Sequence, residues 1–184
     1  MRLRLTIAYD GRPFAGWQSQ AGGNTLQDHL ERSVQRVLKL DAKPAIHGSG
    51  RTDAGVHGLA QVAHVDVPDG CRMEMAAWVR ALNVHLPAAI RVTSVSPASP
   101  EFHARFDATG KRYRYRIWHA PILPPLEAGL AWHVPHRLDF ATLSAACRLC
   151  EGEHDFTAFA ANRGDGKDEG RDAVRELWSV TVDH

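Results

Sequence analysis

Apolar and polar side chains alternate at the start of the chain, over residues 2–9. The apolar positions would share one face of a strand: Leu3, Leu5, Ile7 and Tyr9. The next apolar series has helical spacing, and its members are Leu26, Leu30, Val34, Val37 and Leu38. Asn24 and Gln27 predict a capping box at the start of this helix.

Three further strands and a second helix are expected in the next part of the chain. The strands are predicted over residues 44–48, 61–67 and 90–95, and the helix over residues 73–86. The element order is then β-α-β-β-α-β, the split βαβ or ferredoxin-like arrangement of α+β proteins. We therefore expect an antiparallel sheet with two helices on one face and the opposite face free for a partner.

A Pro- and Ser-containing linker near residue 100 divides the chain into two expected halves, 1–100 and 101–184. In the second half, alternation predicts strands over residues 111–118 and 174–182, and Asp139 predicts the cap of a helix ending near Leu149. These elements do not complete a second β-α-β-β-α-β half. The final strand also has no following helix to cover its apolar face, so the pattern predicts that part of the C-terminal half is missing.

Composition narrows the class of protein. The formal net charge is +1, so a nucleic-acid site would have to come from local clustering of basic residues. The sequence contains neither an apolar run of membrane-spanning length nor a signal-peptide core. The 3 cysteines form no recognisable zinc motif, and the 11 histidines match no metal-binding pattern. We expect a cytoplasmic protein with no membrane association, no metal and no cofactor.

The segment from Gly50 to His57 is the strongest candidate for chemistry. It places Asp53 close to Arg51 in a glycine-rich stretch that favours tight turns or close approach to a ligand. A carboxylate in such a loop can act on a substrate that the arginine holds. The alternative is a turn aspartate that caps its own backbone.

A second candidate segment runs from Phe102 to Arg116 and interleaves basic with aromatic side chains. Basic groups can contact phosphates, and aromatic rings can stack on unpaired bases. The alternative is an ordinary two-faced strand with solvated arginines. The pattern does not match the glycine-containing RNP1 motif of RRM domains.

Taken together, these motifs resemble the tRNA pseudouridine synthase A family. The resemblance extends over nearly the whole chain and rests on ordered segments: Tyr9-Asp10-Gly11, Phe14-x-Gly16-Trp17-Gln18, Thr25-Leu26-Gln27, Gly50 to His57, Phe102 to Arg105, Lys111 to Tyr115, and His154 to Phe159. It implies a homodimeric isomerase that converts uridine to pseudouridine at positions 38, 39 and 40 of the tRNA anticodon stem-loop, with neither cofactor nor metal.

The resemblance also implies roles for individual residues. Asp53 matches the catalytic aspartate, Arg51 the arginine linked to base flipping, and Tyr113 the tyrosine that packs on the target base. Contacts with tRNA are expected from further residues: Arg72, Phe102, His103, Arg105, Lys111, Arg112, Arg163 and Lys167. The first half would carry the catalytic loop, and the incomplete second half would carry the stacking tyrosine and tRNA contacts.

Two other functions stay open at this point. One is a non-catalytic RNA-binding fragment that keeps the basic residues without a complete active site. The other is a generic ferredoxin-like interaction domain, which would have no use for Arg51 close to Asp53.

Overall fold

The computed structural model describes residues 1–159 and 173–183. It is a mixed α+β protein that divides by contacts into two units, Met1–Tyr113 and Arg114–His184. The boundary between these units differs from the linker near residue 100, because residues 101–113 make their contacts with the first unit.

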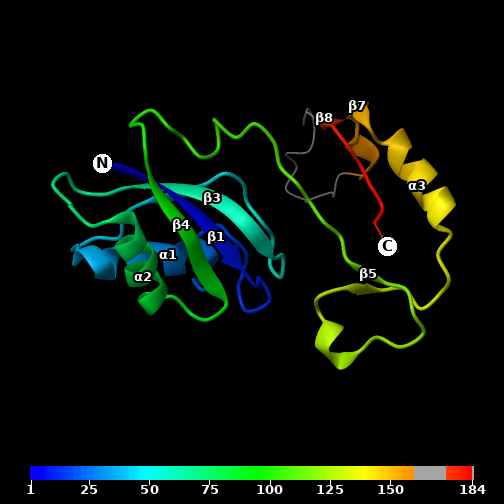
Figure 1. Ribbon diagram of the computed structural model, residues 1–184, viewed down its shortest axis with the longest axis horizontal. Coiled ribbons are helices and arrows are strands. Elements are labelled where there is room, and N and C mark those ends of the chain that lie inside the picture. The colour runs from blue at the N-terminus through cyan, green and yellow to red at the C-terminus, as the bar shows by residue number, and fades with distance from the viewer. Residues whose placement is uncertain (160–172, 184) are drawn as a thin grey trace. The chain divides into compact units, whose positions relative to one another are not determined.

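The first unit is built on one four-stranded antiparallel sheet (Figure 1). Its strands are β1 (Arg2–Tyr9), β2 (Ile46–Gly48), β3 (Gly58–Asp66) and β4 (Ile90–Ala98). The order across the sheet is β2-β3-β1-β4, so β1 lies in the interior between β3 and β4. Alternate residues of β1 are buried, because successive side chains of a strand point to opposite faces of the sheet and one face forms the core.

Helices α1 (Leu26–Leu38) and α2 (Met75–His85) contact each other on the same side of the sheet (Figure 1). Their apolar side chains join the core formed by the alternate residues of β1: Leu3, Leu5, Ile7 and Tyr9. Each such residue, when fully buried, contributes about 2 kcal/mol of hydrophobic free energy. The predicted antiparallel sheet and the helical spacing in this unit are thereby confirmed.

The cap of α1 lies one residue later than the sequence suggests. Thr25 is the N-cap and forms the capping box with Asp28, so the prediction of Asn24 and Gln27 is wrong. Thr25 has the extended backbone that an N-cap requires, with φ of −101° and ψ of 159°. Asn24 has a φ of 56° and belongs to the turn before the cap.

The face of the sheet opposite the helices is partly covered by the segment that follows β4. Arg2 holds the start of this segment, because its Nη1 donates to the carbonyl oxygens of Pro100 and Phe102 at 2.6 and 2.8 Å. The same guanidinium pairs with Asp66. The face that was expected to be free is therefore crossed by the protein's own chain.

The second unit contains short elements. They are β5 (Ile117–Trp118), the 3₁₀ helix Pro125–Glu127, β6 (Trp132–His133), α3 (Phe140–Leu149), β7 (Gly152–Asp155), the 3₁₀ helix Thr157–Phe159 and β8 (Val174–Leu177). β5 pairs with β6 in parallel, and β7 pairs with β8 in antiparallel. Within the described part of this unit, no residue is fully buried.

Two strand predictions for the C-terminal part were too long. Residues 111–116 have no regular structure, and only residues 117–118 of the predicted strand pair with a neighbour. Likewise, β8 ends at Leu177 rather than at residue 182. The helix was correctly predicted, because Asp139 accepts hydrogen bonds from the backbone of Ala141 and Thr142 at the start of α3.

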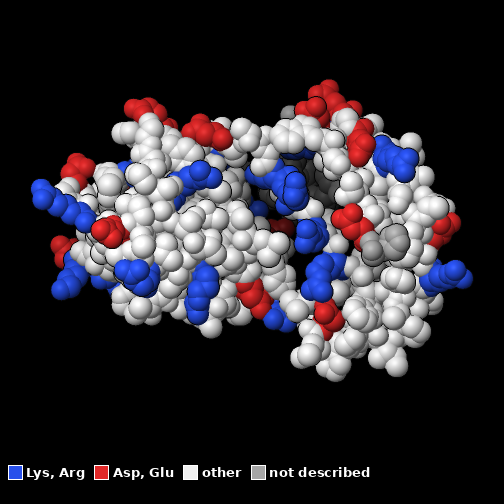
Figure 2. All heavy atoms as spheres, in the orientation of Figure 1, with Lys and Arg blue, Asp and Glu red and all other residues white. Residues whose placement is uncertain are grey.

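Basic and acidic side chains are interspersed over the first unit on the face that Figure 2 shows, which agrees with the small net charge. Among the described residues, no helix combines the length and the apolar character needed to cross a membrane.

Candidate active site

The loop between β2 and β3 carries Asp53, and the end of β1 holds that loop in place. The hydroxyl of Tyr9 lies 3.0 Å from Oγ1 of Thr52, the residue before Asp53. The backbone N–H of Trp17 donates to the carbonyl oxygen of Thr52 at 2.9 Å. Both contacts fix Thr52, so the backbone next to Asp53 is held although the Asp53 side chain itself is exposed.

Close packing of the loop requires glycine at two positions. A Cβ on Gly58 would lie 2.4 Å from the ring of Tyr9, and a Cβ on Gly11 would lie 2.0 Å from the carbonyl oxygen of Val56. Both distances are too short for any side chain. The glycines therefore allow the loop and the end of β1 to approach each other closely.

Polar contacts fix the two ends of the loop. At the start, Gln61 on β3 donates to the carbonyl oxygen of Gly50 at 2.6 Å. At the other end, His57 Nδ1 lies 3.3 Å from Asp10. A hydrogen bond from Arg12 lowers the pKa of Asp10 to about 2, so this carboxylate is ionised at neutral pH.

A hollow of about 600 Å³ lies beside the start of the loop. It is lined by residues of the first unit: Trp17, Gln18, Gln27, Ile46, His47, Gly48, Gly50, Arg51, His103, Arg105, Phe106 and Lys111. Three of these side chains are cationic, namely Arg51, Arg105 and Lys111. The hollow thus combines positive charge with aromatic rings, which suits phosphates and unpaired bases.

Gln27 and Glu31 of α1 form a hydrogen-bond network beside the hollow. Gln27 accepts from the side chain of Gln18 and the backbone of Ser19, both at 3.0 Å, and donates to Glu31 at 2.8 Å. Glu31 also accepts from the backbone N–H of Ile46 on β2 at 3.2 Å. This network joins α1 to the sheet and orients the Gln18 amide.

The predicted catalytic residues lie in the same region of the first unit. Arg51 and Asp53 are on the loop, and Arg51 lines the hollow. Tyr113 is 69% exposed. Burial raises the pKa of Tyr9, the bond to Thr52 acts in the opposite direction, and the nearby phenol of Tyr113 adds to the rise. Tyr113 follows Lys111, which lines the hollow, by two residues.

Of the predicted RNA-contacting residues, His103, Arg105 and Lys111 line the hollow. Phe102 is half-buried against the sheet, with its ring edge-on to His64, and Arg112 is exposed next to Lys111.

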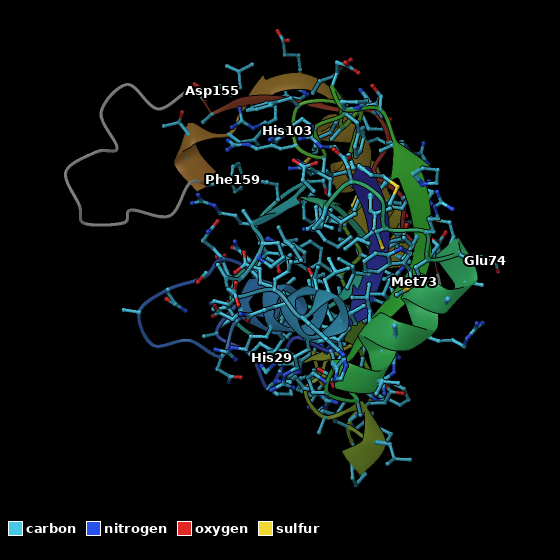
Figure 3. All side chains as sticks on the ribbon, turned by 90° about the vertical axis from the view of Figure 1, so that its left-hand side faces the viewer. His29, Met73, Glu74, His103, Asp155 and Phe159 are labelled. Carbon is cyan, nitrogen blue, oxygen red and sulfur yellow. The ribbon has the colours of Figure 1, made fainter. Side chains whose placement is uncertain are left out.

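Arg72 is not brought to the hollow. It lies after the far end of β3, in the loop before α2, whereas the loop of Asp53 precedes β3. Its neighbours Met73 and Glu74 are well separated from His103 in Figure 3. Arg163 and Lys167 lie outside the described residues.

The sequence did not single out several residues of the hollow. Trp17 and Gln18 belong to a motif that carried the family resemblance, so their signal was present but was not assigned to a site. Gln27 belongs to another of these motifs and was likewise not assigned to a site, His47 has no local pattern that marks it, and Phe106 lies in the basic and aromatic segment without being singled out. Only the packing of β2 and the segment after β4 brings the last two into the same hollow.

The structure offers no donor set for a metal ion within the residues it describes. Three histidines do approach one another, since the rings of His47, His64 and His103 have centroids 4.7 to 5.7 Å apart. However, His64 Nδ1 is already occupied by a backbone N–H.

Comparisons with known proteins agree on one family. A family model described as tRNA pseudouridine synthase matches residues 5–107. A tRNA pseudouridine synthase A of Akkermansia muciniphila is 56% identical over 163 residues, which cover 89% of this chain and 61% of that protein. The protein of the same name from Solibacter usitatus is 44% identical over 184 residues, covering 99% of this chain and 74% of the relative.

The chain belongs to the tRNA pseudouridine synthase family. It spans 61% of the length of the Akkermansia relative and 65% of a relative from Solidesulfovibrio magneticus, which is 45% identical over 185 residues.

Proposed function

We propose that this chain is the catalytic part of a tRNA pseudouridine synthase that isomerises uridine at positions 38, 39 and 40 of the anticodon stem-loop. The observation that carries the proposal is the loop of Arg51 and Asp53, held by Tyr9 and Trp17 beside a cationic, aromatic hollow. Relatives named tRNA pseudouridine synthase A support it.

We further propose that the first unit is a ferredoxin-like half of a two-half enzyme. Its support is the element order β-α-β-β-α-β with strand order β2-β3-β1-β4 and both helices on one face. The second half would begin after residue 100, as the sequence suggests, and would contain the second unit.

The reaction breaks the C1′–N1 bond of uridine and forms a C1′–C5 bond, while the C5 proton leaves and N1 gains a proton. A base inside a stem must first be extruded, which costs a few kcal/mol. Arg51 at the hollow can hold a phosphate or fill the vacated space.

Asp53, as a carboxylate, has two possible roles in this reaction. It can attack C1′ as a nucleophile or remove the 2′ proton as a base. Both roles need an ionised carboxylate within reach of the ribose, and the exposed position of Asp53 on a held loop suits both.

The remaining predicted residues complete the proposal. Tyr113 would stack on the uracil, and its hydroxyl could relay the proton at C5. Contacts with tRNA would come from the cationic and aromatic set: Arg72, Phe102, His103, Arg105, Lys111, Arg112, Arg163 and Lys167. The enzyme would work in the cytoplasm as a homodimer, without metal or cofactor.

One observation favours a second function, RNA binding without catalysis. Asp53 makes no ion pair within the described residues, so no cation in direct contact holds the candidate catalytic carboxylate in place. Such a protein would use the basic hollow for binding only.

Tritium release distinguishes the two functions. The chain is mixed with tRNA that carries tritium at C5 of uridine, and binding to the same tRNA is measured in parallel. Release of tritium into water, with pseudouridine found at positions 38–40, supports the enzyme. Tight binding without release supports the binding protein, and the absence of both contradicts both functions.

A further inference from the structure

His64 is buried on the face of the sheet that does not pack against the helices. It lies on β3 and pairs in register with His47 of β2 and Arg4 of β1, on the face opposite the two helices. A histidine on an open sheet face would be solvated, yet His64 is 2% exposed. The residues that cover it follow β4, since the rings of Phe102 and His103 lie 6.0 and 4.7 Å from the His64 ring.

The contact that joins His64 to this segment is a specific hydrogen bond. The backbone N–H of Ala104 donates to Nδ1 of His64 at 3.1 Å, and Ala104 is itself 3% exposed. A nitrogen that accepts a hydrogen bond carries no proton, so the ring is neutral and its proton lies on Nε2. An imidazolium would present a second N–H to the same donor and lose the bond.

The charges around His64 favour this neutral form. Burial lowers the pKa of His64 to about 4, and Arg2, His103 and His47 act in the same direction. Asp66 opposes them. Arg4, the register neighbour on β1, is a further cation on this face.

The segment that covers His64 also carries side chains of the hollow, before and after Ala104. His103 and Phe106 stack with ring centroids 4.2 Å apart, and the Arg105 guanidinium lies 5.8 Å from the Phe106 centroid. Local bonds shape this turn, because His103 Nδ1 accepts from the backbone of Arg105, and Asp107 accepts from that of His103. The turn therefore keeps its own shape, and Ala104 is the point at which it is joined to the sheet.

We propose that His64 is a positioning residue that fixes Ala104, and thereby sets His103, Arg105 and Phe106 at the RNA-facing hollow. That the hollow faces RNA rests on the proposed function, whereas the hydrogen bond between His64 and Ala104 is a property of the fold alone. His64 would act through the segment and would not touch the RNA.

Two substitutions separate the hydrogen bond from simple packing. In His64→Asn the side-chain oxygen is bonded to Cγ, as Nδ1 is, so an acceptor is retained for Ala104. In His64→Leu the acceptor is lost and the buried N–H has no partner. Val92→Ala serves as a control, because Val92 is 1% exposed in the core of the same sheet and pairs in register with Ile7, whose side chain belongs to the core beneath the helices.

Three measurements are made on each protein. Trypsin cleavage after Arg105 reports release of the segment, nitrogen NMR of labelled histidine reports the tautomer of His64, and titration with an anticodon stem-loop RNA reports binding. We expect cleavage after Arg105 to rise and RNA affinity to fall by about tenfold in His64→Leu. His64→Asn should restore both to within about threefold of the parent, and Val92→Ala should change neither at temperatures where it stays folded.

The NMR signature of the parent should be an unprotonated Nδ1 and a protonated Nε2 at pH 6. A proton on Nδ1, or cleavage that rises equally in His64→Leu and Val92→Ala, would overturn the proposal. Failure of His64→Asn to rescue while folded would do the same. If the parent binds no RNA, the proposed function fails, and the tautomer and cleavage still decide the role of His64.

Discussion

The phenol oxygen of Tyr9 lies 3.0 Å from Oγ1 of Thr52, which joins the end of the interior strand β1 to the residue before Asp53. Tyr9 is 5% exposed, so its ring belongs to the core while its hydroxyl reaches the loop. An interior strand of the sheet thus supports the exposed loop of the candidate site.

Tyr9→Phe should loosen this loop without opening the core. One hydrogen bond is lost, so the free energy of unfolding should fall by about 1 kcal/mol. Turnover should fall several-fold, because the backbone beside Asp53 is less well held. Thr52→Val removes the other partner, and in a double-mutant cycle the two changes should not add. Additive effects would show that the contact does not couple the two residues.

Asp53→Asn should abolish tritium release and leave the fold and tRNA binding almost unchanged. The amide is nearly isosteric with the carboxylate, but it has neither the charge nor the basicity that both possible mechanisms need. Asp41→Asn, at an exposed position after α1, is the matched control and should keep full activity. Asp53→Asn activity within tenfold of the parent would exclude Asp53 as the catalytic carboxylate.

Tyr113→Phe tests the hydroxyl of Tyr113, a residue that is 69% exposed. The ring still stacks, so tRNA affinity should hold, while the single-turnover rate should fall if the hydroxyl relays the C5 proton. Tyr115→Phe, at a position that is 86% exposed, controls for the loss of a phenol. Equal rates in all three proteins would leave Tyr113 a stacking role alone.

Replacing Arg105, Lys111 and Arg112 together by alanine should weaken tRNA binding and flatten its dependence on salt. Each lost phosphate contact lowers the slope of log affinity against log salt by about one unit. A control protein loses three exposed helical charges instead, Arg32, Arg36 and Arg80. An equal slope in both variants would mean that the first three residues are only solvated.

Stability should fall between about pH 6.5 and about pH 4 because of His64, whose pKa is lowered to about 4 mainly by burial. In this window the unfolded chain takes up a proton that folded His64 does not, so unfolding is favoured as the pH falls. The loss is at most roughly 3 kcal/mol.

Chemical denaturation at several pH values measures this loss, and His64→Asn should remove most of it. Burial lowers the pKa of His29 as well, so a smaller slope should remain. Asp10 has a pKa lowered to about 2, so the stability that it provides is lost only at pH values below the window of His64. An equal slope in the parent and in His64→Asn would contradict the prediction.

The sequence by itself determined the elements whose evidence is local. Alternation in β1 and helical spacing in α1 and α2 reflect one buried face each, and Asp139 caps the helix that follows it. The strand predicted over residues 111–118 forms only at residues 117–118. Alternation indicates that one face of a segment is apolar, but it does not show whether a partner strand is present. Even the cap of α1 moved by one residue, because the backbone turn at Asn24 decides which side chain faces the helix.

The motif around Asp53 was also visible in the sequence, but its setting was not. Tertiary structure decided that Tyr9 meets Thr52, that Lys111 approaches Gly50, and that Ala104 covers His64. These partners are separated by 40 or more residues, and each contact depends on the strand order and on the path of the chain after β4. Such contacts form only when the whole sheet is assembled, so no local pattern of residue types could specify them.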